Sequence, residues 1–194
     1  MDRTFQSIST DVWELADQLR DHPVFICGHP KAGTSLLRAV LDSHPQLIVY
    51  PEETMFFRRS LPKMNGLSVE DQLKLAESTL IHIFKWNISQ SEPSQAGFPD
   101  RDYSSMSFAD VRDVMAELLR SRHAHPGDLL SAAVLAFGLV SGVLIREPCY
   151  WVEKSPYNEY FANYIFSWWP EARCIHILRD PRDNFASYRR KHPD

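Results

Sequence analysis

A short loop between two apolar segments contains residue types that bind phosphate. The sequence GHPKAGTS at 28–35 follows the apolar run 24–27 and precedes a helical pattern of apolar residues. Main-chain N–H groups and the hydroxyls of Thr34 and Ser35 would meet at the positive end of this helix, and Lys31 adds a charge. Thr34 stands where the Walker motif of ATP-hydrolysing enzymes has lysine, so the usual support for γ-phosphate chemistry is missing. The loop therefore predicts a phosphate site of another kind.

Polar residues also follow three other apolar runs. Arg179 ends the run 174–178, and Ser187 lies about two helical turns further on, so both side chains could reach one anionic group. Two similar pairs follow the other runs, Glu153 with Lys154 after 150–152, and Glu52 with Glu53 after 47–50. A carboxylate at a strand end can act as a general base, and a nearby lysine can neutralise charge on a transferred group.

The elements that must position these residues alternate along the chain. Apolar runs at 24–27, 47–50, 150–152 and 174–178 predict strands. Helical patterns follow or separate them at about 12–19, 34–44, 69–85, 108–122 and 157–168, and Asp180-Pro181 predicts the cap and first residue of another helix. The segment 87–107, rich in Ser, Pro and Gly, predicts a long loop or lid. This order predicts an α/β fold, a P-loop-like three-layer domain with a mostly parallel central sheet flanked by helices.

Composition limits the classes of function. The 194 residues are 44% hydrophobic and 24% charged, as in one globular domain, and the net charge of −4 argues against broad contact with nucleic acid or anionic lipid. A local basic excess occurs at 179–194, with five basic and three acidic side chains. Three cysteines without a Cys-x-x-Cys pair, and histidines without further ligands, predict neither a disulfide framework nor a metal site.

The compartment follows from two further segments. The 17 uncharged residues 129–145 contain Gly138-x-x-x-Gly142 but fall short of the ~20 that a membrane span needs, so they predict a buried helix. The N-terminus lacks the basic and apolar regions of a signal peptide. We therefore expect a cytoplasmic protein without a membrane span.

Taken together, these motifs resemble sulfotransferases that use 3′-phosphoadenosine 5′-phosphosulfate, in the tyrosylprotein, heparan-type and related bacterial branch. The resemblance rests on PKAGTSL at 30–36, LDSHP at 41–45, EETMFF at 52–57, EKSP at 153–156 and RDPR at 179–182 with Ser187. It implies that Lys31, Ala32, Gly33, Thr34, Ser35 and Leu36 hold the 5′-phosphosulfate, and that Arg179 and Ser187 hold the 3′-phosphate. Glu53 is implied as the base, with Lys31 and Lys154 as the other catalytic residues. His29 is a rival base, better explained as a hydrogen-bonded loop residue.

The resemblance also implies a reaction and a division of the chain. It predicts in-line sulfuryl transfer, without a metal, to a hydroxyl or amine of a small-molecule, carbohydrate or peptide acceptor. One domain, 1–194, would consist of a 5′-phosphosulfate part at 23–60, a helical acceptor-side or lid region at 61–148 and a 3′-phosphate part at 150–194. The oligomeric state stays open.

Two alternative functions stay open, and the first follows from the end of the chain. Family members usually continue past the 3′-phosphate helix, so we expect this part to be incomplete, adenosine 3′,5′-bisphosphate to bind weakly, and the helix after Asp180 to fray. A truncated, inactive nucleotide-binding or interaction module is therefore one alternative. A P-loop small-molecule kinase is the other.

Overall fold

Four parallel strands form the central sheet of the protein. The structure, a computed structural model, describes residues 8–42, 44–85, 103 and 106–191. The strands are β1 (Pro23–Cys27), β2 (Leu47–Val49), β3 (Tyr150–Lys154) and β4 (Arg173–His176). Their order is β2-β3-β1-β4 and every pair is parallel, with Phe25 opposite both Glu153 and Cys174. All four carboxyl ends therefore lie along one edge of the sheet, as predicted for the ligand-binding edge.

The two faces of the sheet are covered by different helices. Val24, Ile26, Val49 and Val152 form a small core beneath α2 (Thr34–Leu41). The alternate residues, among them Phe25, Ile48 and Trp151, point into a much larger core on the opposite face. β1 is buried along its whole length because it contributes to both cores.

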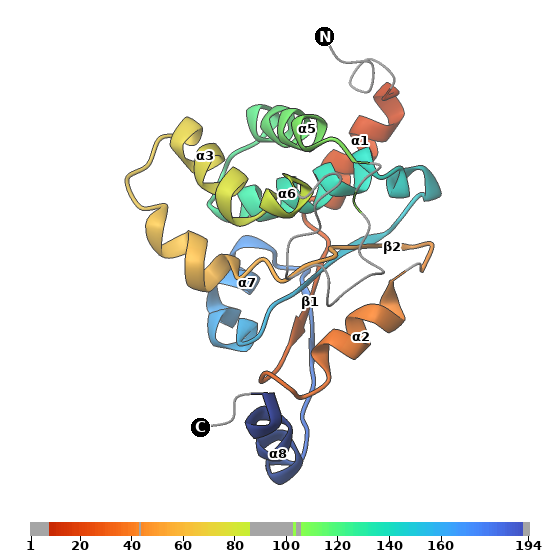
Figure 1. Ribbon diagram of the computed structural model, residues 1–194. Helices are drawn as coiled ribbons and strands as arrows, with labels where there is room; N and C mark the ends of the chain where they lie inside the picture. Colours follow the sequence, from red (N-terminus) through yellow and green to blue (C-terminus); the bar gives the residue numbers. More distant parts are fainter. Residues whose placement is uncertain (1–7, 43, 86–102, 104–105, 192–194) are drawn as a thin grey trace.

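The larger core lies beneath a layer of helices, which Figure 1 shows on the side of the sheet opposite α2. The layer consists of α1 (Thr10–Leu19), α3 (Val69–Thr79), α5 (Phe108–Ser121), α6 (Gly127–Val140) and α7 (Ala162–Trp168). α6 is buried on nearly every side and approaches the sheet closely, since a Cβ at Gly138 would stand 3.0 Å from Ile48. The predicted α/β architecture with a parallel sheet between two helical layers is thus confirmed.

The last helix, α8 (Pro181–Lys191), follows β4 and lies at one end of the molecule (Figure 1). The N–H of Arg182 donates to Asp180 Oδ1 at 2.9 Å, which confirms the predicted cap. Phe185 is 63% exposed. α8 thus has little apolar packing of the kind that buries α6, although the predicted fraying stays a prediction.

Shorter helical turns connect the main elements. They are a π-helical turn, Phe56–Ser60, and 3₁₀ turns at Leu61–Lys63, His82–Lys85, Val143–Arg146 and Asn158–Phe161. Three sequence expectations change as a result. The helix predicted over 69–85 ends at Thr79, and the 3₁₀ turn His82–Lys85 follows it. The helix predicted over 129–145 ends at Val140 because Gly142, at φ +74°, breaks it, and the helix predicted from Tyr157 begins as a 3₁₀ turn. Most of the loop predicted at 87–107 lies outside the described residues.

None of the helices in the described ranges is long and apolar enough to cross a membrane.

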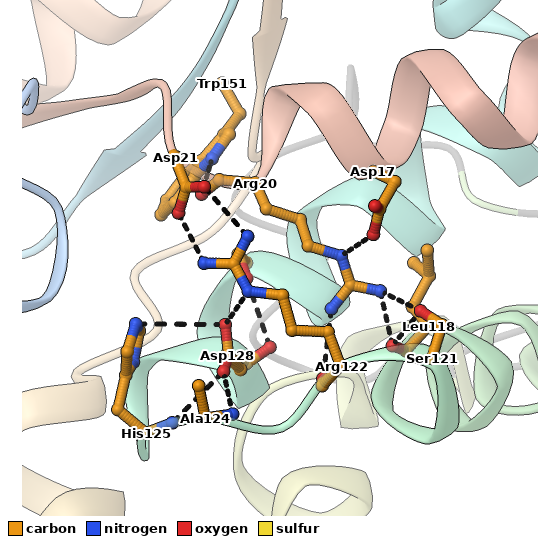
Figure 2. A network of polar contacts seen from close by, with 11 residues as sticks. Asp17, Arg20, Asp21, Leu118, Ser121, Arg122, Ala124, His125, Asp128 and Trp151 are labelled. Carbon is orange, nitrogen blue, oxygen red and sulfur yellow. Dashed lines mark hydrogen bonds and ion pairs between the residues drawn. The ribbon is translucent and has the colours of Figure 1, made fainter.

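A buried polar network joins α1, α5 and α6 just ahead of β1 (Figure 2). Arg20, fully buried, donates to the carbonyls of Leu118 and Arg122 and pairs with Asp17. Its own carbonyl accepts from Trp151 Nε1 at 3.2 Å, which links the network to β3. The network therefore fixes the chain immediately before β1 to the helical layer.

Asp128 anchors the other half of this network. Its buried carboxylate accepts from the N–H groups of Ala124 and His125 at 2.6 and 3.1 Å and lies 3.6 Å from Arg122 Nε. Arg122 also binds Asp21 at 2.8 Å, and this hydrogen bond holds the pKa of the Asp21 carboxyl below its ordinary value. Through its contacts with both Asp21 and Asp128, Arg122 joins the turn after α1 to the start of α6.

Candidate active site

The loop after β1 has the strained backbone that a phosphate-binding turn needs. Gly28, Lys31 and Gly33 all have positive φ, at +139°, +71° and +112°. A Cβ at Gly28 would lie 2.7 Å from the carbonyl oxygen of Ile177, so only glycine fits beside the chain after β4. α2 begins at Thr34, and the N–H groups of its first turn lack partners within the helix. The loop thus presents unpaired donors at a helix N-terminus, as expected for an anion site.

A cavity of about 730 Å³ opens beside this loop. It brings together six residues singled out from the sequence, namely Lys31, Gly33, Thr34, Ser35, Glu53 and Lys154. The remaining lining residues are Pro30, Met55, Arg58, Arg59, Pro156, Tyr157 and Tyr188. Four cationic side chains and a single carboxylate therefore face one space, which favours an anionic ligand.

Lys154 lies between the base candidate and the phosphate loop. Its Nζ contacts Glu53 Oε1 and donates to Ser35 Oγ at 2.9 Å. The lysine is only 3% exposed, whereas Glu53 is 37% exposed and faces the cavity. Glu52 points elsewhere, with its Oε1 3.5 Å from the hydroxyl of Tyr103, so the two neighbouring glutamates diverge.

Glu153, the residue before Lys154, is buried beneath the cavity. Its carboxylate accepts from Thr54 Oγ1, Ser155 Oγ and Asn158 Nδ2 at 2.7, 2.6 and 2.7 Å. Burial raises the pKa of the Glu153 carboxyl, and these hydrogen bonds oppose the rise. Glu153 therefore connects two chain segments rather than facing the cavity.

A second cavity, of about 580 Å³, adjoins the first and shares Tyr157 and Tyr188 with it. Arg179 lines it, and Arg179 Nη1 donates to the carbonyl of Lys31 at 3.0 Å. His29, Pro181, Asn184 and Phe185 complete its lining. This cavity thus combines one cation with several ring side chains, a lining that suits an anionic ligand with an aromatic ring.

Three of the predicted ligand residues line neither cavity. Ala32 is buried, and Leu36 is 70% exposed on α2. Ser187 lies on α8 and does not line the cavity that contains Arg179. His29 lines only the second cavity, where its Nε2 lies 3.4 Å from the hydroxyl of Tyr157. The structure therefore separates His29 from the cavity that contains Glu53.

The match to known families covers both cavities. Residues 23–192 match the model of the sulfotransferase family. The chain belongs to the sulfotransferase family. Neither the curated proteins nor the solved structures contain a significant match to it. Sulfuryl transfer is the chemistry of this family, and the matched residues include every candidate site residue.

Sequence reasoning missed part of the candidate site. Arg58 and Arg59, in the π-helical turn, bring two of the four cations to the cavity, and Arg58 lies over the ring of Tyr157 at 4.9 Å. Tyr157 has a left-handed backbone, at φ +71°. The one available signal was a pair of arginines shortly after the Glu52-Glu53 pair.

Another cavity, of about 560 Å³, lies between α1 and α5. Its charged lining residues are Glu14, Asp17 and Glu117, all acidic. An anionic donor would be repelled there, so this cavity is a poor candidate for the transfer reaction. Within the described ranges, no three His, Cys, Asp or Glu side chains are grouped so that they could hold a metal ion.

Proposed function

We propose that the protein transfers a sulfuryl group from 3′-phosphoadenosine 5′-phosphosulfate to a hydroxyl or amine acceptor. The observation that carries this proposal is the contact of Lys154 with both Glu53 and Ser35 at the floor of the cationic cavity. A carboxylate, an ammonium group and a phosphate-binding loop thus meet at one point. This arrangement suits removal of a proton on one side of the transferred group and stabilisation of charge on the other.

The two cavities match the charges of the donor. Lys31, Lys154 and the N–H groups at the start of α2 suit the 5′-phosphosulfate, and Arg179 in the adjoining cavity suits the 3′-phosphate. Tyr157, Phe185 and Tyr188 offer ring faces to the nucleoside.

The transfer step balances without a further reactant. Glu53 accepts the proton of the acceptor O–H or N–H as that oxygen or nitrogen forms a bond to sulfur. The bond from sulfur to the bridging phosphate oxygen breaks, and its electron pair leaves with adenosine 3′,5′-bisphosphate. Lys31, Lys154 and the loop amides stabilise the charge on the departing oxygen.

The carboxylate base also bears on the branch and on the acceptor. A glutamate base at this position is typical of the tyrosylprotein, heparan-type and related bacterial branch of the family. The cytosolic aryl branch uses a histidine base instead. The acceptor class, whether small molecule, carbohydrate or peptide, stays a prediction, as do the cytoplasmic location and the independence from metal.

Binding and transfer measurements test the proposal directly. We expect calorimetry to show binding of adenosine 3′,5′-bisphosphate and no comparable binding of ATP with Mg²⁺, because Thr34 replaces the lysine of ATP-hydrolysing enzymes. Transfer of labelled sulfate to a panel of phenols, amines, sugars and tyrosine peptides then identifies the acceptor. Preference for ATP with Mg²⁺ would favour the kinase, and failure of both nucleotides to bind would favour an interaction module.

A further inference from the structure

The buried carboxylate of Glu153 organises the two segments that carry the proposed catalytic pair. Glu153 is 1% exposed and lies in β3, between β1 and β2 in the sheet. Its Oε1 accepts from the N–H and the hydroxyl of Thr54 at 3.3 and 2.7 Å and from Ser155 at 2.6 Å, while its Oε2 accepts from Asn158 at 2.7 Å. The carboxylate therefore receives four hydrogen bonds without facing the cavity.

Every donor to Glu153 is close in sequence to Glu53 or to Lys154. Thr54 directly follows Glu53, and Ser155 directly follows Lys154. Ser155 Oγ also accepts from the N–H of Met55 at 2.8 Å. Met55 has a left-handed backbone, at φ +50°. The hydrogen bonds thus fasten the loop after β2 to the loop after β3, about 100 residues apart in the chain.

We propose that Glu153 is a positioning residue for the transfer reaction, which sets the side chain of Glu53 against Lys154 by holding the backbone of Thr54 and Met55. This inference rests on the proposed function for its chemistry, and on the hydrogen bonds for its geometry. Glu153 lines neither of the two adjoining cavities. Its effect reaches the reaction only through Glu53 and Lys154.

A purely structural role accounts less well for the carboxylate. Burying an ionisable group costs free energy, and an apolar side chain of similar volume would fill the same space at lower cost. Met55 in its left-handed conformation is also costly and needs surrounding contacts to hold it. Ser155, which donates to Glu153, supplies one such contact by accepting from the N–H of Met55.

Two substitutions distinguish the hydrogen-bonding role of the Glu153 carboxylate from the space that its side chain fills. Glu153→Met keeps most of the volume and removes both oxygens, whereas Glu153→Gln keeps an oxygen acceptor for Thr54 and Ser155. For Glu153→Met we expect kcat to fall at least tenfold, with the donor KM and the affinity for adenosine 3′,5′-bisphosphate changing less than threefold. For Glu153→Gln we expect kcat within about threefold of the wild type. A folded Glu153→Met protein with wild-type kcat would overturn the proposal.

A milder variant keeps the test decisive if Glu153→Met fails to fold. Thr54→Val removes the 2.7 Å hydrogen bond to Glu153 and the 3.2 Å hydrogen bond from the N–H of Phe56, and keeps the side-chain shape, so kcat should fall severalfold with the donor KM unchanged. The matched control is Ser131→Ala, which removes a buried hydroxyl on α6 that donates to the carbonyl of Asp128. It should alter thermal stability but leave kcat unchanged. An equal kcat in Thr54→Val and the wild type would count against positioning.

Crystal structures of the variants give a readout that does not depend on activity. We expect Glu53 to leave Lys154 in Glu153→Met and Thr54→Val, and to stay beside it in Glu153→Gln and Ser131→Ala. If the wild type transfers no sulfuryl group, the proposed reaction fails, but these structures still decide whether Glu153 positions Glu53. An undisturbed Glu53–Lys154 contact in Glu153→Met would overturn the positioning role alone.

Discussion

Lys154 holds the carboxylate of Glu53 at the floor of the cationic cavity, and the same ammonium group donates to Ser35 at 2.9 Å. The base candidate and the phosphate loop are thus joined by one buried lysine. An incoming sulfuryl group would compete with Glu53 for Lys154. Such competition would free the carboxylate to accept a proton only once the donor is bound.

Replacing this carboxylate should abolish most turnover. We expect Glu53→Gln to lower kcat on the order of 10²-fold or more, because an amide cannot accept the acceptor's proton, with binding of adenosine 3′,5′-bisphosphate unchanged. Steady-state kinetics and calorimetry measure both quantities. Glu52→Gln is the control, since Glu52 faces Tyr103 and not the cavity, and should retain activity. Loss of turnover in Glu52→Gln, with activity retained in Glu53→Gln, would show that Glu52 is the base.

The lysine in the loop should contribute to anion binding. Lys31→Ala is expected to weaken binding of adenosine 3′,5′-bisphosphate, or to reduce kcat/KM, by about 1 to 3 kcal/mol, the range for a lost charged hydrogen bond. Lys63→Ala removes an exposed lysine that lines neither cavity and serves as the control. Equal affinities and rates for Lys31→Ala and the wild type would remove Lys31 from the site.

The loop should not tolerate a side chain at Gly28. A Cβ there would stand 2.7 Å from a main-chain oxygen, which cannot move aside as a flexible side chain can. We expect Gly28→Ala to lower both the melting temperature and nucleotide affinity. Gly66→Ala, also at positive φ but with open space around it, reports the backbone strain alone and should leave nucleotide binding intact. Similar nucleotide affinities in the two variants would argue against the tight packing of the loop on the chain after β4.

Removing the buried carboxylate of Asp128 should destabilise the fold. Asp128→Ala leaves the N–H groups of Ala124 and His125 without their acceptor and Arg122 without one of its partners. The expected loss is about 3 to 5 kcal/mol in the free energy of unfolding, measured by urea denaturation. Glu70→Ala breaks an exposed ion pair with Lys74 and should change stability by less than about 1 kcal/mol. Comparable losses in both variants would contradict the buried role of Asp128.

The buried Glu153 should make stability depend on pH. Burial raises the pKa of its carboxyl above the ordinary glutamate value of about 4.5. Between that value and the higher folded pKa, the folded protein retains a proton that the unfolded chain has lost, so the free energy of unfolding falls as pH rises. Glu153→Gln should remove this contribution, which urea titrations at several pH values can measure. A wild-type slope in the variant would assign the effect to another group.

Local patterns in the sequence determined much of the scaffold. The apolar runs predicted the positions of all four strands. For β1 the reason is burial on both faces of the sheet, which requires apolar residues along its length, whereas β4 is exposed along its length. The glycines and hydroxyls at 28–35 likewise predicted a tight turn before a helix start, since positive φ and a helix start are properties of neighbouring residues, while phosphate binding there stays a prediction. The order of strands and helices then predicted the parallel sheet and its ligand-binding edge.

Only the tertiary structure decided which of these parts meet. β3 lies beside β1, which brings Lys154 to Ser35 across 119 positions of the chain. The π-helical turn directs Arg58 and Arg59 into the same cavity, and the loops after β2 and β3 join at the carboxylate of Glu153. Contacts of this kind depend on strand order and on the burial of single side chains. Neither leaves a periodic signal in the sequence, because both arise from the pairing of segments far apart in the chain.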